Sequence, residues 1–469
     1  MKFATVCRSI YAVLLSLVVA HTASAASVLN FVKSTVDDHS NAGLAVVNPT
    51  SKFADLQFTL YGLDGNPVSS GLVNPVRYRV APNGQFSMRA NDIFAASKID
   101  GWIQVTSSTT GLVGFYLAAD LGATLEGSLS ANALPDQVVP VIRDDQETKT
   151  ELVIVNPTAE NSTIAVSLFN SNGEKTGTVL PQLIRGYGAL RLPTSSLNSA
   201  GAGTLSARIS ASVPVAATAI VDRGGSLLYV SGQPVNEISS LRVAPQFISG
   251  GGYDSVLILA NPSASVVTVS VTLFPGASSQ TGSVDAPGTA RLAIPPGGSV
   301  ITDARTILNR PLTPTVNGWV RVESDNGPLV GLVITNQGQA VTSVPLQAQP
   351  LTRGLYAQVL NTDAAVTSLA FVNPSESDAA VTVALLHDDG ITVAQAGFSV
   401  RAASKYTTLL QDLLPAAAAD LNGYFVVAAT TPVYSIATLA SSNQALLASI
   451  PPIGLPDTFM FCNVAGLLH

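Results

Sequence analysis

The apolar positions of the chain form a pattern that occurs four times. In each copy a short apolar run stops at Asn-Pro followed by Thr or Ser, and apolar and polar residues then begin to alternate. The four pairs are Asn48-Pro49, Asn156-Pro157, Asn261-Pro262 and Asn373-Pro374. Successive pairs are separated by 108, 105 and 112 residues. A regular spacing of this size indicates tandem homologous units.

Each Asn-Pro pair is predicted to end a strand. Proline has no N–H group to donate to a sheet, and it drives the residue before it into an extended conformation. The asparagine side chain can bond the backbone two residues further on. Turn chemistry therefore accounts for every residue type in the motif, and we interpret these eight residues as structural turns. The alternative is a rim of ligand-binding amides.

The segment after each pair has the period of a strand with one buried face. In the third unit Val267, Val269 and Val271 alternate with Thr268 and Ser270, as expected for a half-buried strand. Turn glycines follow the asparagine by 15 to 17 residues, and they are Gly65, Gly173, Gly276 and Gly390. Later in each unit a short segment is compatible with one helical turn, at 91–94, 196–197, 303–308 and 411–414.

The predicted fold class is all-β: four tandem immunoglobulin-like β-sandwich domains of about seven strands each, after a cleaved signal peptide. Frequent turn signals and little helix are typical of such sandwiches. The predicted ranges are 1–25 for the signal peptide, 26–136, 137–241, 242–350 and 351–458 for repeats 1 to 4, and 459–469 for a C-terminal tail. Because the junctions between repeats are short, we expect a semi-rigid row.

The first 25 residues predict export. Two basic residues, an apolar run and the small-residue sequence Ala23-Ser24-Ala25 are typical of a secretory signal peptide. The run is shorter than the ~20 residues that a spanning helix needs, so we expect no integral membrane span after cleavage. The predicted location is secreted, extracellular or cell-surface, with the periplasm as a further option. Of the two cysteines only Cys462 remains after cleavage, which excludes an intrachain disulfide.

The charge and amino-acid composition of the chain restrict the classes of partner that we expect. The net charge is −7 and charged residues are 11% of the chain, which argues against nucleic acid as a partner. An apolar content of 47% raises an outer-membrane β-barrel as a minor alternative. Aromatic residues make up only 6% of the chain, too few for the interfacial girdles of such a barrel.

The sequence contains no catalytic motif. The histidines left after cleavage, His39, His387 and His469, are scattered, and no hydrolase or zinc-protease signature occurs. We therefore predict no enzyme activity, no cofactor and no metal. Carboxylate pairs occur at Asp37-Asp38, Asp144-Asp145 and Asp388-Asp389. Calcium needs more oxygen ligands than two adjacent carboxylates provide, so these pairs are interpreted as solvated loops.

Two tryptophans are the candidate ligand-binding residues. Strand alternation places Trp102 with Gln104 and Trp319 with Arg321 on the polar faces of their strands. Tyr424 occupies the corresponding position in the fourth unit. An exposed aromatic ring beside hydrogen-bonding side chains suits stacking on a sugar. The alternative is that each ring folds over a sheet edge or into a domain junction.

The Asn-Pro-Thr/Ser corner, the turn glycine and the Gly-aromatic strand resemble the tandem repeats of uncharacterised exported bacterial proteins with immunoglobulin-like or fibronectin-like sandwiches. The resemblance implies extracellular or cell-surface placement and no known activity. We predict a non-enzymatic exported structural, adhesion or envelope-associated protein. The alternative is a secreted carbohydrate-binding protein that uses its exposed aromatics. The expected partners are a cell-surface or matrix polysaccharide or another envelope protein.

Overall fold

The structure is a computed structural model that describes residues 27–120, 124–196, 203–237, 239–276, 286–309, 315–359, 365–417, 423–441 and 447–455. The predicted signal peptide, the predicted tail and Cys462 lie outside these residues. The fold is all-β and of the sandwich type, as predicted. The short helical turns are also confirmed, as α2 (Ala90–Ile93), α3 (Ala304–Leu308), α4 (Leu410–Leu413) and the 3-10 turn η1 (Thr194–Ser196). A further 3-10 turn, η2 (Pro415–Ala417), follows α4.

The first unit consists of two four-stranded antiparallel sheets, so it has one strand more than the approximate number expected. The first sheet has the order β1-β6-β3-β4, with β1 (Ser27–Val36), β6 (Ile99–Ser107), β3 (Ala54–Tyr61) and β4 (Val76–Val80). The second has the order β5-β2-β7-β8, with β5 (Gln85–Arg89), β2 (Ser40–Val47), β7 (Val113–Asp120) and β8 (Thr124–Leu129). We call them the leading and the trailing sheet.

The other three units repeat this pairing order, although single long strands join the two layers in the second and fourth. The second unit contains β9 (Leu134–Arg143), β10 (Thr148–Val155), β11 (Ser162–Phe169), β12 (Lys175–Ile184), β13 (Ala189–Pro193), β14 (Thr204–Arg223), β15 (Ser226–Ser231) and β16 (Gln233–Pro234). The third contains β17 (Leu241–Gly250), β18 (Tyr253–Ala260), β19 (Val267–Phe274), β20 (Gly288–Ile294), β21 (Ser299–Asp303), β22 (Val316–Ser324), β23 (Val330–Gln337) and β24 (Ala340–Pro345). The fourth contains β25 (Leu351–Val359), β26 (Ala365–Asn373), β27 (Ala379–Leu386), β28 (Thr392–Val400), β29 (Ser404–Leu409), β30 (Gly423–Ser441), β31 (Leu447–Ile450) and β32 (Ile453–Gly454). The expected boundary between residues 136 and 137 falls inside β9.

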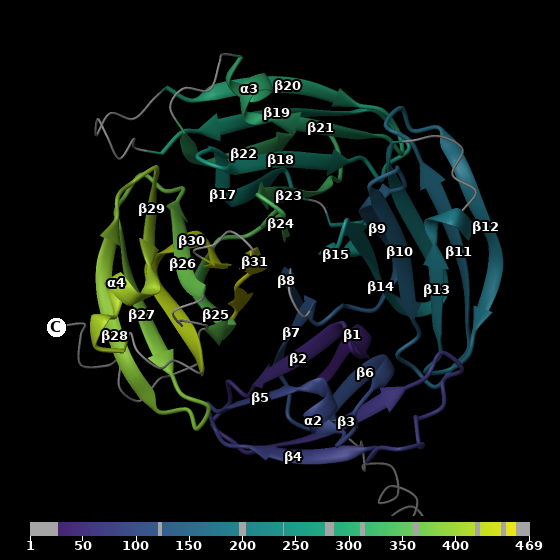
Figure 1. Ribbon diagram of the computed structural model, residues 1–469. Coiled ribbons are helices and arrows are strands. Elements are labelled where there is room, and N and C mark those ends of the chain that lie inside the picture. Colours follow the sequence, from purple (N-terminus) through teal and green to yellow (C-terminus); the bar gives the residue numbers. More distant parts are fainter. Residues whose placement is uncertain are drawn as a thin grey trace, which may run out of the picture.

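The four units form a closed ring (Figure 1), so the expectation of a row is wrong. The same backbone hydrogen bond recurs at three junctions. Ala189 N donates to Leu63 O at 3.0 Å between the first and second units, and Ser299 N donates to Ser171 O at 3.1 Å between the second and third. Gln85 N donates to Asp388 O at 2.7 Å, which joins the fourth unit back to the first. The junction between the fourth and first units, which closes the ring, is therefore made by the same backbone hydrogen bond as the first two junctions along the chain.

Three of the four predicted turn glycines lie at these junctions, whereas Gly276 contacts Asn317 O of its own unit. Gly65, Gly173 and Gly390 all have φ between 80° and 86°, a region that disfavours other residues. Each is also packed against the next unit: a Cβ on Gly390 would lie 2.5 Å from Asn83 O, and one on Gly65 would lie 2.3 Å from Gly186 O. Glycine is therefore required at these positions for two reasons: the turn needs a positive φ, and the backbone of the next unit leaves no room for a Cβ.

The apolar runs before Asn-Pro are strands buried on both faces. In β10, Leu152 and Ile154 belong to the core of the second unit, whereas Val153 and Val155 belong to the core cluster of the first. Similarly, Ala45, Val47, Val113 and Phe115 of the first unit join the core of the fourth. The trailing sheet of each of these units thus packs between its own leading sheet and the preceding unit. Burial on both faces explains why these runs do not alternate.

Each Asn-Pro corner is held by a buried asparagine with its hydrogen bonds satisfied. Asn261 Nδ2 donates to the carbonyl oxygens of Ser265 at 2.7 Å, Ile294 at 3.0 Å and Pro295 at 3.1 Å. Its Oδ1 accepts from the backbone N (2.9 Å) and the Oγ (2.7 Å) of Ser263. The other three corners repeat the bonds to residues i+2 and i+4. The motif therefore locks the end of one strand to the turn that precedes another.

The edge strand of each trailing sheet, β8, β15, β24 or β31, lies at the centre of the ring (Figure 1). Each of these strands contributes a buried residue with a polar side chain, namely Glu126, Tyr229, Thr342 and Ser449. Thr342 Oγ1 donates to Ser449 Oγ at 3.0 Å. Burial raises the pKa of Glu126 well above its ordinary value of 4.5, so the carboxyl group is protonated where an exposed glutamate is ionised.

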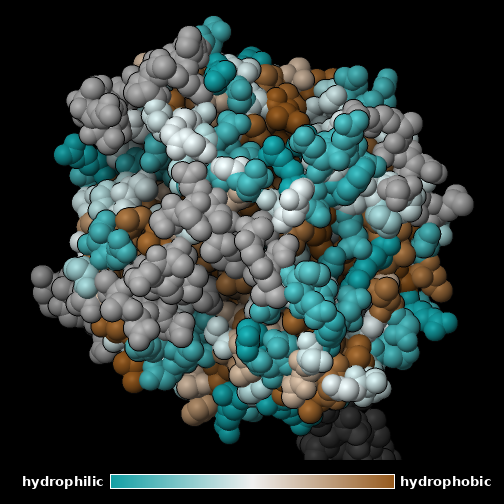
Figure 2. Space-filling view, in the orientation of Figure 1, coloured by the Kyte–Doolittle hydropathy of each residue, from teal (hydrophilic) through white to brown (hydrophobic). Residues whose placement is uncertain are grey.

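The outer surface mixes polar and apolar residues. Figure 2 shows hydrophilic and hydrophobic side chains interspersed over the face seen in Figure 1. Exposed large apolar side chains occur singly in different units, for example Phe53, Leu183, Val266 and Ile391. Scattered apolar side chains of this kind are ordinary for a protein surface. No helix in the described part of the chain has the length and apolar character needed to cross a membrane.

Candidate functional site

A cleft of about 570 Å³ lies between the first and second units. The first unit contributes the end of β1, the start of β2, the start of β6 and part of β7, and the second contributes β13, β14 and β15. Since the four units share one fold, the cleft arises from the junction itself, where the leading sheet of one unit faces the trailing sheet of the next. We call it the first cleft.

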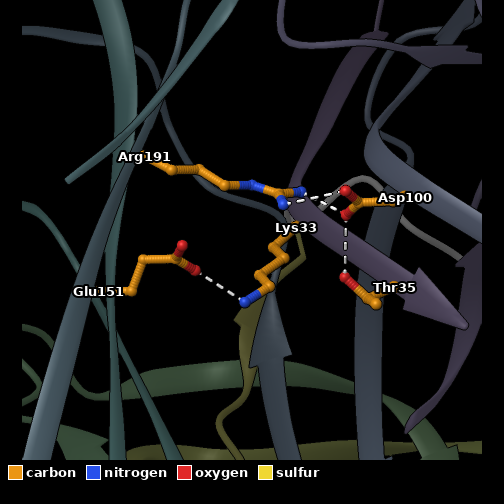
Figure 3. Close-up of polar contacts among 5 residues, drawn as sticks. All are labelled: Lys33, Thr35, Asp100, Glu151 and Arg191. Carbon is orange, nitrogen blue, oxygen red and sulfur yellow. Dashed lines mark hydrogen bonds and ion pairs between the residues drawn. The ribbon is translucent and has the colours of Figure 1, made fainter. Parts of the chain in front are cut away.

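The rim of the first cleft carries two ion pairs that join the two units (Figure 3). Lys33 Nζ lies 2.7 Å from Glu151 Oε2. Arg191 donates two hydrogen bonds to Asp100, of 2.6 and 3.1 Å, and Thr35 Oγ1 donates to Asp100 Oδ1 at 3.3 Å. The bidentate geometry fixes the orientation of the guanidinium group, which makes Arg191 a positioned donor rather than a mobile one.

A third cation reaches the same rim. Lys98 is exposed and lies 2.7 Å from Asp38 Oδ2. The neighbouring Asp37 Oδ1 accepts hydrogen bonds from the backbone N of His39 (2.8 Å) and of Ser40 (2.7 Å), which lower the pKa of Asp37. The Asp37-Asp38 pair therefore shapes a turn and positions a lysine. Each cation at the rim has a carboxylate partner, so the rim has little net charge.

The floor of the first cleft is apolar and aromatic. Tyr116 and Tyr229 meet there with ring centroids 5.8 Å apart, and aliphatic side chains such as Val36, Ile99 and Ile220 surround them. Burial raises the pKa of both phenols well above 10. Their hydroxyl groups therefore stay neutral, so the floor offers apolar and aromatic surface without charge.

The site has the composition of a binding cleft. An apolar floor with a few fixed polar groups at its rim is the usual arrangement of small-molecule sites. Within the described residues no group of three or more His, Cys, Asp or Glu side chains is arranged to hold a metal ion. The described lining also contains no hydroxyl nucleophile paired with a histidine base.

The aromatic residues predicted to bind ligand lie elsewhere, and their predicted exposure is wrong. The side chains of Trp102, Trp319 and Tyr424 are 0%, 4% and 1% exposed. Trp102 Nε1 donates to Tyr187 O of the second unit at 2.9 Å, and Tyr424 Oη donates to Asn83 O of the first unit at 2.5 Å. The face assigned to solvent is covered by the next unit, because the ring stacks one sandwich on another.

The polar neighbours of these rings also serve the junctions or their own sheet. Gln104 Nε2 donates to Pro157 O of the second unit at 2.9 Å. Trp319 stacks on Phe274 with centroids 4.0 Å apart and belongs to a cluster with Val372 of the fourth unit. Arg321 lies 5.3 Å from the centroid of the Phe274 ring and 3.3 Å from Glu323. The structure thus distributes the predicted residues over three junctions and does not bring them together.

Sequence reasoning missed the first cleft because its residues are distant in the chain. Lys33 and Glu151 are 118 positions apart, and Asp100 and Arg191 are 91 apart. Only the mutual packing of two units brings them together. The available signal was weak: β1, β6, β10 and β13 each carry a charged residue close to a buried run, but charged residues are also ordinary on the solvated face of a strand.

The fold defines an all-β protein built from repeated sandwich units, and the first cleft adds a site with the features of ligand binding. The chain belongs to a family of unknown function, DUF5719, whose model matches residues 17–228 and 248–447. Each matched stretch extends over two of the four units. No curated protein matches the chain by sequence.

Among solved structures the similarities are distant. Bacteroides uniformis beta-glucuronidase 2, covalently bound to cyclophellitol-6-carboxylate aziridine, is 10% identical with a TM-score of 0.12, over 56% of this chain and 27% of that chain. Streptomyces avermitilis alpha-L-rhamnosidase complexed with L-rhamnose is 8% identical with a TM-score of 0.12, over 84% and 55%. The chain thus spans about a quarter to a half of those proteins. Likenesses at this level carry no argument about function.

Proposed function

We propose that this chain is an exported, non-enzymatic adhesion or envelope-associated protein that binds a neutral saccharide of a cell-surface or matrix polysaccharide in the first cleft. The observation that carries the proposal is the composition of that cleft. A tyrosine-containing apolar floor lies below a rim of paired charges, in a volume of about 570 Å³. Pyranose rings have an apolar face and a polar edge, and this arrangement offers a surface to each.

The charge balance of the rim favours a neutral ligand over an acidic one. Lys33, Lys98 and Arg191 each have a carboxylate partner within 2.7 Å. A paired ammonium or guanidinium group still has N–H donors left, and a paired carboxylate still has free acceptor positions. Sugar hydroxyls both donate and accept, so they can use these groups without the cost of placing an unpaired charge in the site.

The proposal is tested by retention of the exported chain on a panel of insoluble polysaccharides and cell-wall preparations. The test variant is Asp100→Ala, which frees Arg191 and removes the central acceptor of the rim. The matched control is Asp325→Ala, which breaks the exposed Arg291–Asp325 pair in the third unit. We expect the wild type and the control to be retained and Asp100→Ala to be lost, with all three melting at similar temperatures.

Two outcomes would contradict saccharide binding in the first cleft. One is equal retention of all three proteins, which would place the binding surface elsewhere. The other is lack of retention of the wild type on every polysaccharide, which would leave a purely structural role or binding to another envelope protein. Carbohydrate binding through exposed aromatics, the alternative suggested by the sequence, has lost its support because those rings are buried.

A further inference from the structure

The junction between the second and third units holds a second cleft, of about 260 Å³, in the place that corresponds to the first. The register of the trailing sheets establishes the correspondence. Val153 of β10 pairs with Arg191 of β13 at the first cleft. Ile258 of β18 pairs with Ile301 of β21 at the second. The two clefts are therefore built from the same backbone with different side chains.

Two substitutions between the clefts remove charge from the wall formed by the following unit. Ile301 stands where the first cleft has Arg191, and Val256 stands where it has Glu151, two residues before Val153 and Ile258 respectively. Leu228, Ile334 and Val341 complete an aliphatic interior. Ile301 is 48% exposed, an apolar side chain facing an opening. A sugar would leave its hydroxyls unpaired against these walls, so the ligand of this cleft needs an apolar body.

The mouth of the second cleft carries positive charge. Arg143 and Arg223 line it together with Asn336 and Thr148. Arg223 Nη1 donates to the neutral Asn336 Oδ1 at 3.3 Å, so this contact leaves its charge uncompensated. Arg143 Nη2 lies 3.4 Å from Asp145 Oδ2, longer than the ion pairs of the first cleft. Guanidinium groups at the mouth of an aliphatic cavity suit a carboxylate on an apolar tail.

From these features we propose that the second cleft binds an aliphatic carboxylate, with the hydrocarbon chain against Ile258, Ile301 and Ile334 and the carboxylate at Arg143 and Arg223. The apolar surface removed from water supplies the affinity. The two arginines fix the orientation and select the charged head over a neutral one. The site is separate from the first cleft, so its ligand and the saccharide can be tested independently.

Isothermal titration calorimetry with octanoate, 1-octanol and acetate tests the proposal. We expect octanoate to bind, 1-octanol to bind roughly tenfold or more weakly because it lacks the charge-assisted contacts, and acetate to show no binding. Arg223→Ala should lower the octanoate affinity towards that of 1-octanol, with Arg143 still in place, and leave the affinity for 1-octanol unchanged. Equal binding of octanoate and acetate would overturn the proposal, as would no heat from either amphiphile.

A wall variant locates the binding. Ile301→Glu places a carboxylate in the cleft and should weaken octanoate binding at least about tenfold, while polysaccharide retention stays as in the wild type. The matched control is Ile391→Glu, at a position that is 64% exposed and lies in the fourth unit. Both positions are exposed, so neither variant is expected to unfold the chain. Equal octanoate binding by both variants would place the site outside this cleft.

Discussion

The indole Nε1 of Trp102 donates a 2.9 Å hydrogen bond to the carbonyl oxygen of Tyr187, across the junction between the first and second units. The ring of Tyr61 stacks on both residues, with centroids 5.1 Å from Trp102 and 4.9 Å from Tyr187. Trp102, which the sequence suggested as an exposed ligand-binding residue, thus holds two sandwiches together. Replacing its ring tests the junction rather than a ligand site.

We predict that Trp102→Phe lowers the free energy of unfolding by about 1–3 kcal/mol, because it leaves the Tyr187 carbonyl without its partner in a buried junction. Urea unfolding measures the change. The control is Trp319→Phe, which removes a similar ring volume from the junction between the third and fourth units. A Trp102→Phe loss no larger than that of the control would mean that ring packing alone, and not the hydrogen bond, matters.

Ring closure predicts a strong effect at Gly390. The substitution Gly390→Ala adds a Cβ that would lie 2.5 Å from Asn83 O of the first unit, at a position with φ of 82°. Gly111→Ala is the matched control, since Gly111 has φ of 78° and no neighbouring atom within 4 Å of an added Cβ. Backbone strain is common to both, so overpacking should cost Gly390→Ala roughly 1–3 kcal/mol more. Similar melting temperatures for the two variants would contradict a tight contact between the fourth and first units.

The Asn-Pro corners predict a large penalty for losing the asparagine. Asn261→Ala removes three Nδ2 contacts and two Oδ1 contacts. Buried carbonyl groups then lose their donor, so we expect a loss of about 3 kcal/mol. Asn66→Ala, in an exposed turn, should change stability by less than about 0.5 kcal/mol. Thermal unfolding of both variants gives the comparison, and a loss below about 1 kcal/mol for Asn261→Ala would show that the corner does not depend on this side chain.

The buried carboxyl at the centre of the ring predicts a pH dependence. Burial raises the pKa of Glu126 above its ordinary value of 4.5, so above about pH 4.5 the folded state holds a proton that the unfolded state has released. The free energy of unfolding should therefore fall with rising pH, by about 1.4 kcal/mol per unit while the two states differ by one proton.

Glu126→Gln should remove this contribution. The amide cannot ionise, so the difference in stability between the variant and the wild type should grow in favour of the variant from pH 5 to pH 8. Urea unfolding at both pH values measures it, and the other titrating groups cancel in the difference. If the two proteins showed the same change between these pH values, the carboxyl would not be buried and protonated in the fold.

Much of the local structure could be predicted from the sequence. The alternation around Val267 predicts β19, and the short segment 303–308 is compatible with the helical turn α3, where Asp303 Oδ1 accepts from Thr306 N at 2.8 Å. Such signals depend on contacts within a few residues or on the period of one strand. They define elements and their order, and they identify the repeat.

The arrangement of the units could not be predicted in the same way. Tyr424 and Asn83 are 341 positions apart, and no local pattern encodes their contact. One signal was nevertheless present. Leu152, Val153, Ile154 and Val155 form an unbroken apolar run, where a sandwich with one solvated face would alternate. Such a run indicates a strand covered on both sides, and in this chain the second cover is a neighbouring sandwich.

Closure also limits how this architecture can change in copy number. An open array of repeats grows or shrinks at its ends, and its end repeats need polar outer faces. Here the fourth unit covers the apolar side of the first through Ala45, Val47 and Phe115, so neither end unit serves as a cap. Losing one unit would expose the apolar faces of the two units on either side of it. A fifth unit would have no free apolar face on which to pack. The number of repeats is therefore set by the closure of the ring, as the number of strands is set in a closed β-barrel.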